Sequence, residues 1–126
     1  MSTLKAENIQ SITTGPPIFK TSAGTEAGQL AKAWVNFDGT GTIAISDDFN
    51  VDSITDGGTA HYTVNFTNSM SNANYVVVVS SYMAASNSAA AYERLEDLLA
   101  QSFRIRTVHS SSFQDLDLVC AAVFGA

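Results

Sequence analysis

A chain of 126 residues has the size of one ordinary domain, so we expect no second catalytic domain within it. It is 45% hydrophobic and only 14% charged, which leaves ample apolar surface to bury and argues against disorder. Its net charge of -6 argues against nucleic-acid binding, because a phosphate backbone requires clustered Lys and Arg.

Targeting signals and cysteine usage point to a protein made in a reducing cytoplasm. The longest purely apolar runs, such as Val76 to Val79, are far too short to cross a bilayer, so we expect no membrane insertion. No basic segment followed by an apolar one opens the chain, and we therefore expect no secretory signal peptide. Cys120 is the only cysteine and cannot form an intrachain disulfide.

The first 31 residues differ from the rest of the chain. They contain Pro16 and Pro17, which interrupt any helix or central strand, although Thr3 to Ile12 can form a short strand or helix. Their isolated apolar side chains cannot be buried within the segment itself. We therefore predict that residues 1–31 form an extended arm for a partner surface, and that residues 32–126 form the folded domain.

From Lys32 onward, apolar and polar residues alternate with the period of two that is typical of half-buried antiparallel strands. The pattern is clearest in His61 to Thr67, where Tyr62 and its apolar neighbours face inward. Turn residues such as Asp56-Gly57-Gly58 recur at intervals of about ten residues. The sequence thus predicts an all-β fold, an antiparallel β-sandwich of about seven or eight strands, or else a small barrel. The predicted strands span residues 32–37, 43–45, 48–54, 61–67, 75–82, 102–108 and 116–124. In 48–54 the alternation loses phase before Ile54, which indicates a bulge or the end of the strand.

Ser88 to Gln101 is the only helical candidate in the chain. Ser88 suits the N-cap position. The apolar residues that follow fall at helical spacing, namely Tyr92, Leu95, Leu98 and Leu99. Because the segment is short and lies between predicted strands, a loop with one helical turn fits nearly as well as a short helix over residues 88–100.

Two predicted strands, Tyr75 to Tyr82 and Leu116 to Phe124, are apolar on both faces. In a sandwich, one face of a strand points to the core and the other to water. The second face is therefore covered by the arm or the helix, or it forms a subunit interface in which burial contributes roughly 25 cal/mol per Å². We predict an assembly interface that contains Ile9, Ile12, Phe19, Val76, Val78, Val119 and Val123.

No motif in the chain indicates a metal site or a catalytic site, and we predict no cofactor. Aspartates crowd between Asp38 and Asp56, but their spacing does not match an EF-hand, so solvated turn acids are favoured over calcium ligands. A hydrolase needs a nucleophile, a base and an orienting group, and neither a G-x-S-x-G nor an H-E-x-x-H motif occurs. His61 falls at an outward position and His109 at a turn. The carboxylate pairs Asp47-Asp48 and Glu93–Asp97 lack a recognisable glycosidase context.

The segments that carry the core strands resemble a module that recurs in bacteriophage tail-fibre and other tail-associated proteins. They are AWVNFDGTG (Ala33–Gly41), FNVDSITDGGTAHYTVNFT (Phe49–Thr67) and NANYVVVV (Asn72–Val79). SFRIRT and the closing LDLVCAAVFG are similar to the last strands of the module. The opening MSTLKAENIQ is similar to a segment that links such modules to the virion. This resemblance covers most of the chain from Ala33 to Val79 and is weaker elsewhere.

The resemblance implies a virion protein without catalytic residues, made in the host cytoplasm and assembled as a homotrimer. It implies adsorption to a host-surface glycan or protein, and the loops Met83–Asn87 and Ser110–Asp115 are the expected contacts. Ser88 to Gln101 departs from the module, and the chain is short for a fibre. The alternative is therefore a capsid decoration (cement) protein, or a baseplate or tail adaptor, that attaches to other virion proteins through the arm without binding a receptor. A polysaccharide depolymerase is a further rival.

Overall fold

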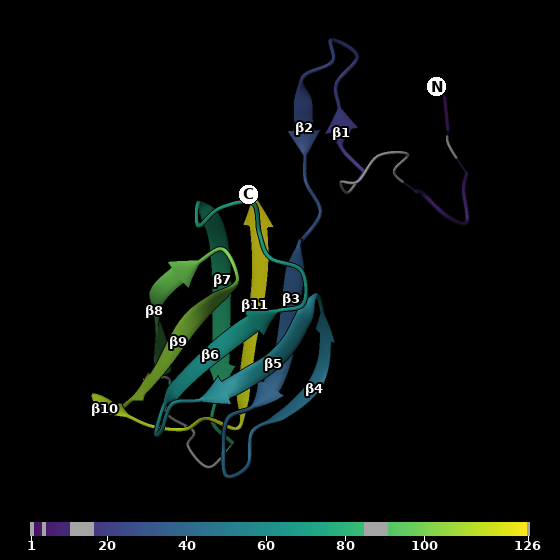
Figure 1. Ribbon diagram of the computed structural model, residues 1–126. Helices are drawn as coiled ribbons and strands as arrows, with labels where there is room; N and C mark the ends of the chain where they lie inside the picture. Colours follow the sequence, from purple (N-terminus) through teal and green to yellow (C-terminus); the bar gives the residue numbers. More distant parts are fainter. Residues whose placement is uncertain (1, 4, 11–16, 85–90, 126) are drawn as a thin grey trace. The chain divides into compact units, whose positions relative to one another are not determined.

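The chain forms two compact units, Met1–Leu30 and Ala31–Ala126, in a computed structural model that describes residues 2–3, 5–10, 17–84 and 91–125. Every regular element in the described residues is a β-strand, so the predicted all-β class is confirmed (Figure 1). The first unit ends one residue before the predicted end of the arm. A helix of the length and apolarity needed to cross a bilayer is absent from the described residues.

The first unit contains a small antiparallel hairpin of β1 (Phe19–Lys20) and β2 (Glu26–Gly28). The turn between the strands is closed by a hydrogen bond of 2.8 Å that the Thr21 amide donates to the Thr25 carbonyl. Gly24 lies in this turn with a φ of 81°, a conformation that a residue without a Cβ adopts at little cost.

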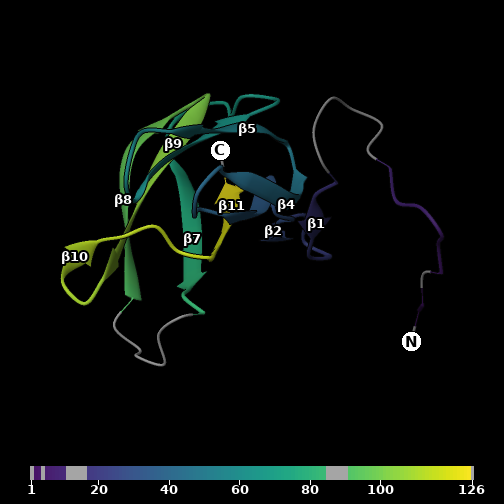
Figure 2. The ribbon, with the colours of Figure 1, turned by 90° about the horizontal axis from the view of Figure 1, so that it is seen from below.

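The second unit consists of two antiparallel sheets that pack face to face, as the view in Figure 2 shows. The first sheet has the strand order β4-β3-β11-β7. Its strands are β3 (Ala33–Asp38), β4 (Ala44–Phe49), β7 (Tyr75–Tyr82) and β11 (Leu118–Gly125). The second sheet has the order β8-β9-β6-β5, and the short β10 pairs with the end of β9. Its strands are β5 (Val51–Asp56), β6 (His61–Phe66), β8 (Ala91–Leu99), β9 (Ser102–His109) and β10 (Ser112–Phe113).

The corner between β4 and β5 is formed by Asn50, which has a φ of 57°. Its side-chain amide donates hydrogen bonds of 3.1 Å to the carbonyls of Lys32 and Asn68, and its Oδ1 accepts one of 2.8 Å from the Asn68 amide. Asn tolerates this left-handed conformation better than most residues. The prediction that Phe49 and Val51 share one face of a strand over residues 48–54 is thus wrong, because the chain changes sheet at Asn50, leaving Phe49 exposed and Val51 buried. The predicted loss of phase before Ile54 is matched by a register shift between Val51 and Ser53.

The predicted short helix over residues 88–100 is also wrong over its described part. Ala91–Leu99 forms β8, which pairs with β9 and shifts its register between Glu96 and Leu99. Asp97 has a φ of 45° at this bulge. Because the extra residue changes the phase of the alternation, the leucines on either side of it fall at a spacing that imitates a helix. Ser88, the predicted N-cap, lies outside the described residues.

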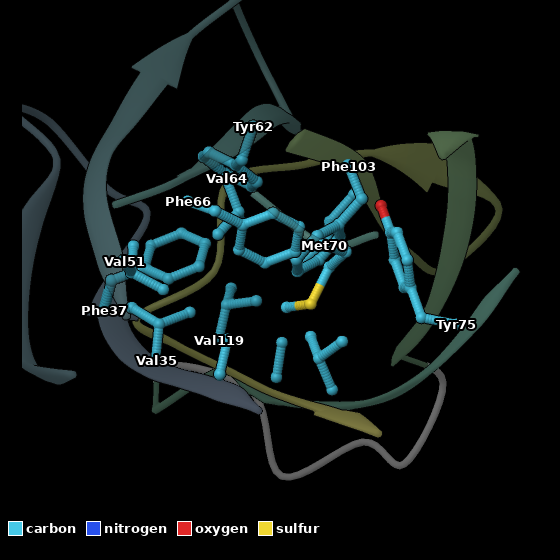
Figure 3. Packing of buried hydrophobic residues seen from close by; sticks show 14 of the residues in the cluster. Val35, Phe37, Val51, Tyr62, Val64, Phe66, Met70, Tyr75, Phe103 and Val119 are labelled. Carbon is cyan, nitrogen blue, oxygen red and sulfur yellow. The ribbon is translucent and has the colours of Figure 1, made fainter. Parts of the chain in front are cut away.

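The core between the two sheets is built from the inward residues of the strands (Figure 3). The predicted inward position of Tyr62 is confirmed, and its ring meets that of Phe37 edge-on with centroids 5.2 Å apart. Phe66 and Tyr75 form a second edge-on pair at 5.7 Å. Such pairs contribute about 0.5–1.5 kcal/mol beyond the burial of their area, so they hold the sheets in one relative position.

Hydrogen bonds around the Tyr62 hydroxyl connect three loops at one end of the core, those that contain Gly39, Ala60 and Asp115. The hydroxyl lies 2.9 Å from Asp115 Oδ1 and 3.1 Å from the Gly39 carbonyl, and the Ala60 amide donates a hydrogen bond of 2.6 Å to the same carboxylate. Gly39 leaves room for the phenol, since a Cβ there would lie 2.5 Å from the Tyr62 hydroxyl. Burial first, and then the bond to Asp115 and its charge, raise the pKa of Tyr62 above its ordinary value of 10.0.

Alkaline unfolding tests this contact. Because folded Tyr62 holds its proton more tightly than the unfolded chain, its contribution to stability is complete below pH 10 and falls as the pH rises further. We expect the Tyr62→Phe variant to be less stable at pH 7 by about 1–3 kcal/mol, because Asp115 loses a donor. It should lose less additional stability between neutral and alkaline pH than the wild type. Urea unfolding measures the free energy of unfolding at pH 7 and its change at alkaline pH, and Tyr82→Phe, at an exposed tyrosine, is the control. If the free energies of unfolding of the wild type and Tyr62→Phe change in parallel with pH, the account is contradicted.

Candidate functional site

The outer side of the sheet β4-β3-β11-β7 carries apolar side chains across its width. On β7, the buried Tyr75 and the half-buried Val77 and Val79 face the core, so Val76 and Val78 point away from it. These two valines are 61% and 58% exposed. We define the apolar face as Trp34, Phe49, Val76, Val78, Ala122 and Phe124.

The register of the sheet makes the apolar face continuous. Ala122 lies opposite Val78 on one side and Trp34 on the other, and Trp34 lies opposite Phe49. One apolar row therefore crosses all four strands of the sheet. Val76 and Phe124 lie opposite each other in the next row. Cross-strand neighbours of this kind lie about 4.5–5.5 Å apart at Cβ, so the side chains lie next to one another and form one patch.

The structure divides the predicted interface residues of the sandwich into two groups. Val76 and Val78 are exposed on the apolar face, whereas Val119 and Val123 are only 0% and 1% exposed and belong to the core. The prediction is wrong for Val119 and Val123, because β11 points its odd-numbered residues inward and its even-numbered residues outward. Both alternating sets of this strand are apolar, and only the pairing with β3 and β7 decides between them.

The predicted interface residues of the arm lie in the first unit. Ile9 and Phe19 are 62% and 46% exposed, and Ile18 and Leu30 are exposed as well. Ile12 lies outside the described residues. The described part of the arm thus leaves its large apolar side chains uncovered within its own unit, as the sequence predicts.

Trp34, Phe49, Ala122 and Phe124 belong to the apolar face but are absent from the predicted interface. Trp34 stands on the face of its strand opposite to Ala33 and Val35, and this alternation is visible in the sequence. Phe49 could not be placed from the sequence, because the predicted strand ran through the corner at Asn50. One acidic residue, Asp47, lies beside the face and pairs with Asn36 on β3.

The carboxylates and histidines that the sequence analysis weighed and set aside as catalytic or metal-binding groups lie apart in the structure. Glu93 accepts a hydrogen bond from the Ser81 hydroxyl, whereas Asp97 forms an ion pair of 2.5 Å with Arg104. The carboxylates of Glu93 and Asp97 are therefore not directed at one bond of a substrate, as the two carboxylates of a glycosidase are. His109 is buried at the end of β9, and His61 is half-buried on β6.

The aspartates of the turns stabilise the turns themselves. Asp38 Oδ1 accepts hydrogen bonds from the hydroxyl and the amide of Thr40, at 2.7 and 2.8 Å, and these bonds lower the pKa of Asp38. Asp56 accepts a bond of 2.8 Å from the Gly58 amide in the same way. Within the residues that the structure describes, no three His, Cys, Asp or Glu side chains gather as a metal site would require.

Comparisons of the chain with models of protein families, with curated proteins and with solved structures find no match.

Paired substitutions on β11 and β7 test the orientation of the strands. We expect Val119→Ala to lower the free energy of unfolding by about 2 kcal/mol, because it leaves a cavity in the core. Val78→Ala should change it by less than about 0.5 kcal/mol in dilute solution, because the side chain is already hydrated. Urea unfolding at the lowest usable protein concentration measures the free energy of unfolding of each variant. Losses of similar size would contradict the assignment of Val119 to the core and of Val78 to the outer face.

Proposed function

We propose that the chain is a structural protein of a bacteriophage virion, a short homotrimeric tail-fibre or tail-tip protein that takes part in host adsorption. The apolar face carries this proposal, because large contiguous apolar patches on a soluble domain mark sites of association. The resemblance of Ala33–Gly41, Phe49–Thr67 and Asn72–Val79 to phage tail modules supports the virion as the setting.

Self-association is the use that best fits the apolar face. The face spans a whole sheet and its members carry no charge, so a second copy meets no unpaired charge at its centre. Trp34, Phe49 and Phe124 provide the aromatic anchors that interfaces favour. Each apolar Å² removed from water contributes roughly 25 cal/mol, so copies that cover one another's faces stabilise the assembly.

The arm supplies a second means of attachment. Ile9, Ile18 and Phe19 are exposed, and a segment of this kind reaches a stable packing only on another surface. In the proposed assembly the arm binds neighbouring copies or other virion proteins, and the sandwich faces outward.

A binding role agrees better with the polar residues than catalysis does. The carboxylates of Asp38, Asp56 and Asp115 are used in turns and loop contacts, and Glu93 and Asp97 bind different partners. General acid–base chemistry needs two groups placed around one reacting bond. This distribution supports assembly and adsorption over a depolymerase.

A capsid decoration protein, or a baseplate or tail adaptor, is the second candidate. The exposed apolar residues of the arm favour it. Added to host cells before infection, the purified protein should slow phage adsorption if it is a tail tip. If it leaves adsorption unchanged, while deletion of residues 1–31 abolishes its incorporation into virions, the decoration or adaptor role replaces the tip.

Light scattering tests the assembly. At micromolar concentration we expect three times the chain mass of 13.3 kDa. Val78→Asp should give the single-chain mass with unchanged folding, because it places a charge in the centre of the apolar face. Thr63→Asp, on the outer side of the other sheet, is the matched control and should leave the mass unchanged. A wild-type chain that stays monomeric at all accessible concentrations would refute the assembly.

A further inference from the structure

All three arginines of the chain project from the outer side of the sheet β8-β9-β6-β5. Arg94 on β8 lies directly opposite Arg106 on β9, and His61 on β6 lies opposite Arg106 from the other side. We call these residues the basic row. Like charges in a cross-strand pair destabilise a sheet, so folding alone does not account for the pairing of Arg94 with Arg106.

The carboxylates beside the basic row neutralise it only in part. Glu96 Oε2 lies 3.3 Å from Arg106 Nε, and Asp97 Oδ2 lies 2.5 Å from Nη1 of Arg104 in the neighbouring row. Arg94 is exposed and takes part in no ion pair among the described residues. The basic row thus keeps an unneutralised guanidinium in a chain with a net charge of -6.

An aromatic row runs alongside the basic row. Tyr92 on β8 and Phe113 on β10 both lie opposite Val108 of β9, one on each side. Both rings are about half exposed, at 51% and 47%. The guanidinium of Arg106 lies 4.9 Å from the centroid of the Phe113 ring. Because residues two apart on a strand face the same side, the two rows lie roughly 6–7 Å apart.

This juxtaposition matches an amphipathic ligand that carries an isolated anionic group. A guanidinium binds a carboxylate or a sulfate with two parallel hydrogen bonds, and aromatic rings bind flat apolar surfaces. A sugar ring offers such a surface, and its acidic substituent can reach the adjacent row. A nucleic acid fits less well, since the chain carries twelve acids against six bases and repels a polyanion.

We propose that the basic row and the aromatic row together form a binding site for acidic saccharides. The carboxylate or sulfate group binds between Arg94 and Arg106, and the sugar ring packs on Tyr92 or Phe113. Acidic saccharides would then be the host-surface ligands of the adsorption proposed above, and in that respect the site rests on the proposed function. It lies on the sheet opposite to the one that carries the apolar face, so assembly leaves it accessible.

Titration calorimetry of the full chain tests the site. The probes are oligosaccharides of galacturonic acid, which carry carboxylates, and of sulfated dextran, with neutral dextran and single-stranded DNA as controls. We expect an acidic oligosaccharide to bind and neutral dextran not to bind.

Arg94→Gln should weaken binding of the acidic oligosaccharide by about tenfold or more, because a charge-assisted pair is lost. Tyr92→Ala should weaken it as well. Lys20→Gln, which removes the same charge from the arm, should not.

The proposal is overturned if neither acidic oligosaccharide binds better than neutral dextran, or if Arg94→Gln binds as well as the wild type. Single-stranded DNA that binds as tightly, and with the same dependence on Arg94, would show a general anion site in place of a saccharide site. Light scattering of the same samples separates this test from the test of assembly. A trimer that binds no saccharide refutes the site alone, whereas a monomer that binds one refutes the assembly alone.

Discussion

The register of the two hydrogen-bonded sheets is the constraint on which the other features of the sandwich depend. Successive residues of a strand point to opposite sides, so pairing decides for each side chain whether it enters the core or an outer face. A slip by one residue in β11 would expose Val119 and Val123 and bury Ala122 and Phe124. The aromatic core and the Tyr62–Asp115 contact fix this register, and the composition of each outer face follows from it.

Sequence reasoning succeeded where alternation is unambiguous and failed where local features change its phase. The period of two predicted β6 and its inward Tyr62, because the outward residues of this strand are polar. It could not assign the faces of β11, since both alternating sets are apolar and only the pairing with β3 and β7 distinguishes them. The positive φ of Asn50 and the bulge at Asp97 were invisible in the pattern, so a corner was taken for a strand and a strand for a helix. Of the apolar face, the sequence predicted Val76 and Val78, and the register added Trp34, Phe49, Ala122 and Phe124.

The two outer faces divide the proposed roles between association and recognition. One sheet presents the aliphatic and aromatic side chains of the apolar face, whose burial is favourable against any complementary apolar surface. The other sheet presents arginines beside exposed aromatic rings. Arginines are costly to bury without a charged partner, but they suit a ligand that remains partly hydrated. In an assembly built on the first face, the second is repeated once per copy, and several weak contacts then combine into firm attachment.

Trp34 provides the most direct measurement of the central claim, that copies of this chain cover one another's apolar faces. It is the chain's only tryptophan, it lies within the apolar face, and it is 37% exposed in the single chain. Acrylamide quenching of its fluorescence should weaken as the protein concentration rises through the range of assembly, and should stay strong at all concentrations in Val78→Asp. Quenching in the wild type that stays as strong as in Val78→Asp at every concentration would contradict the account, because no second copy would then be covering the face.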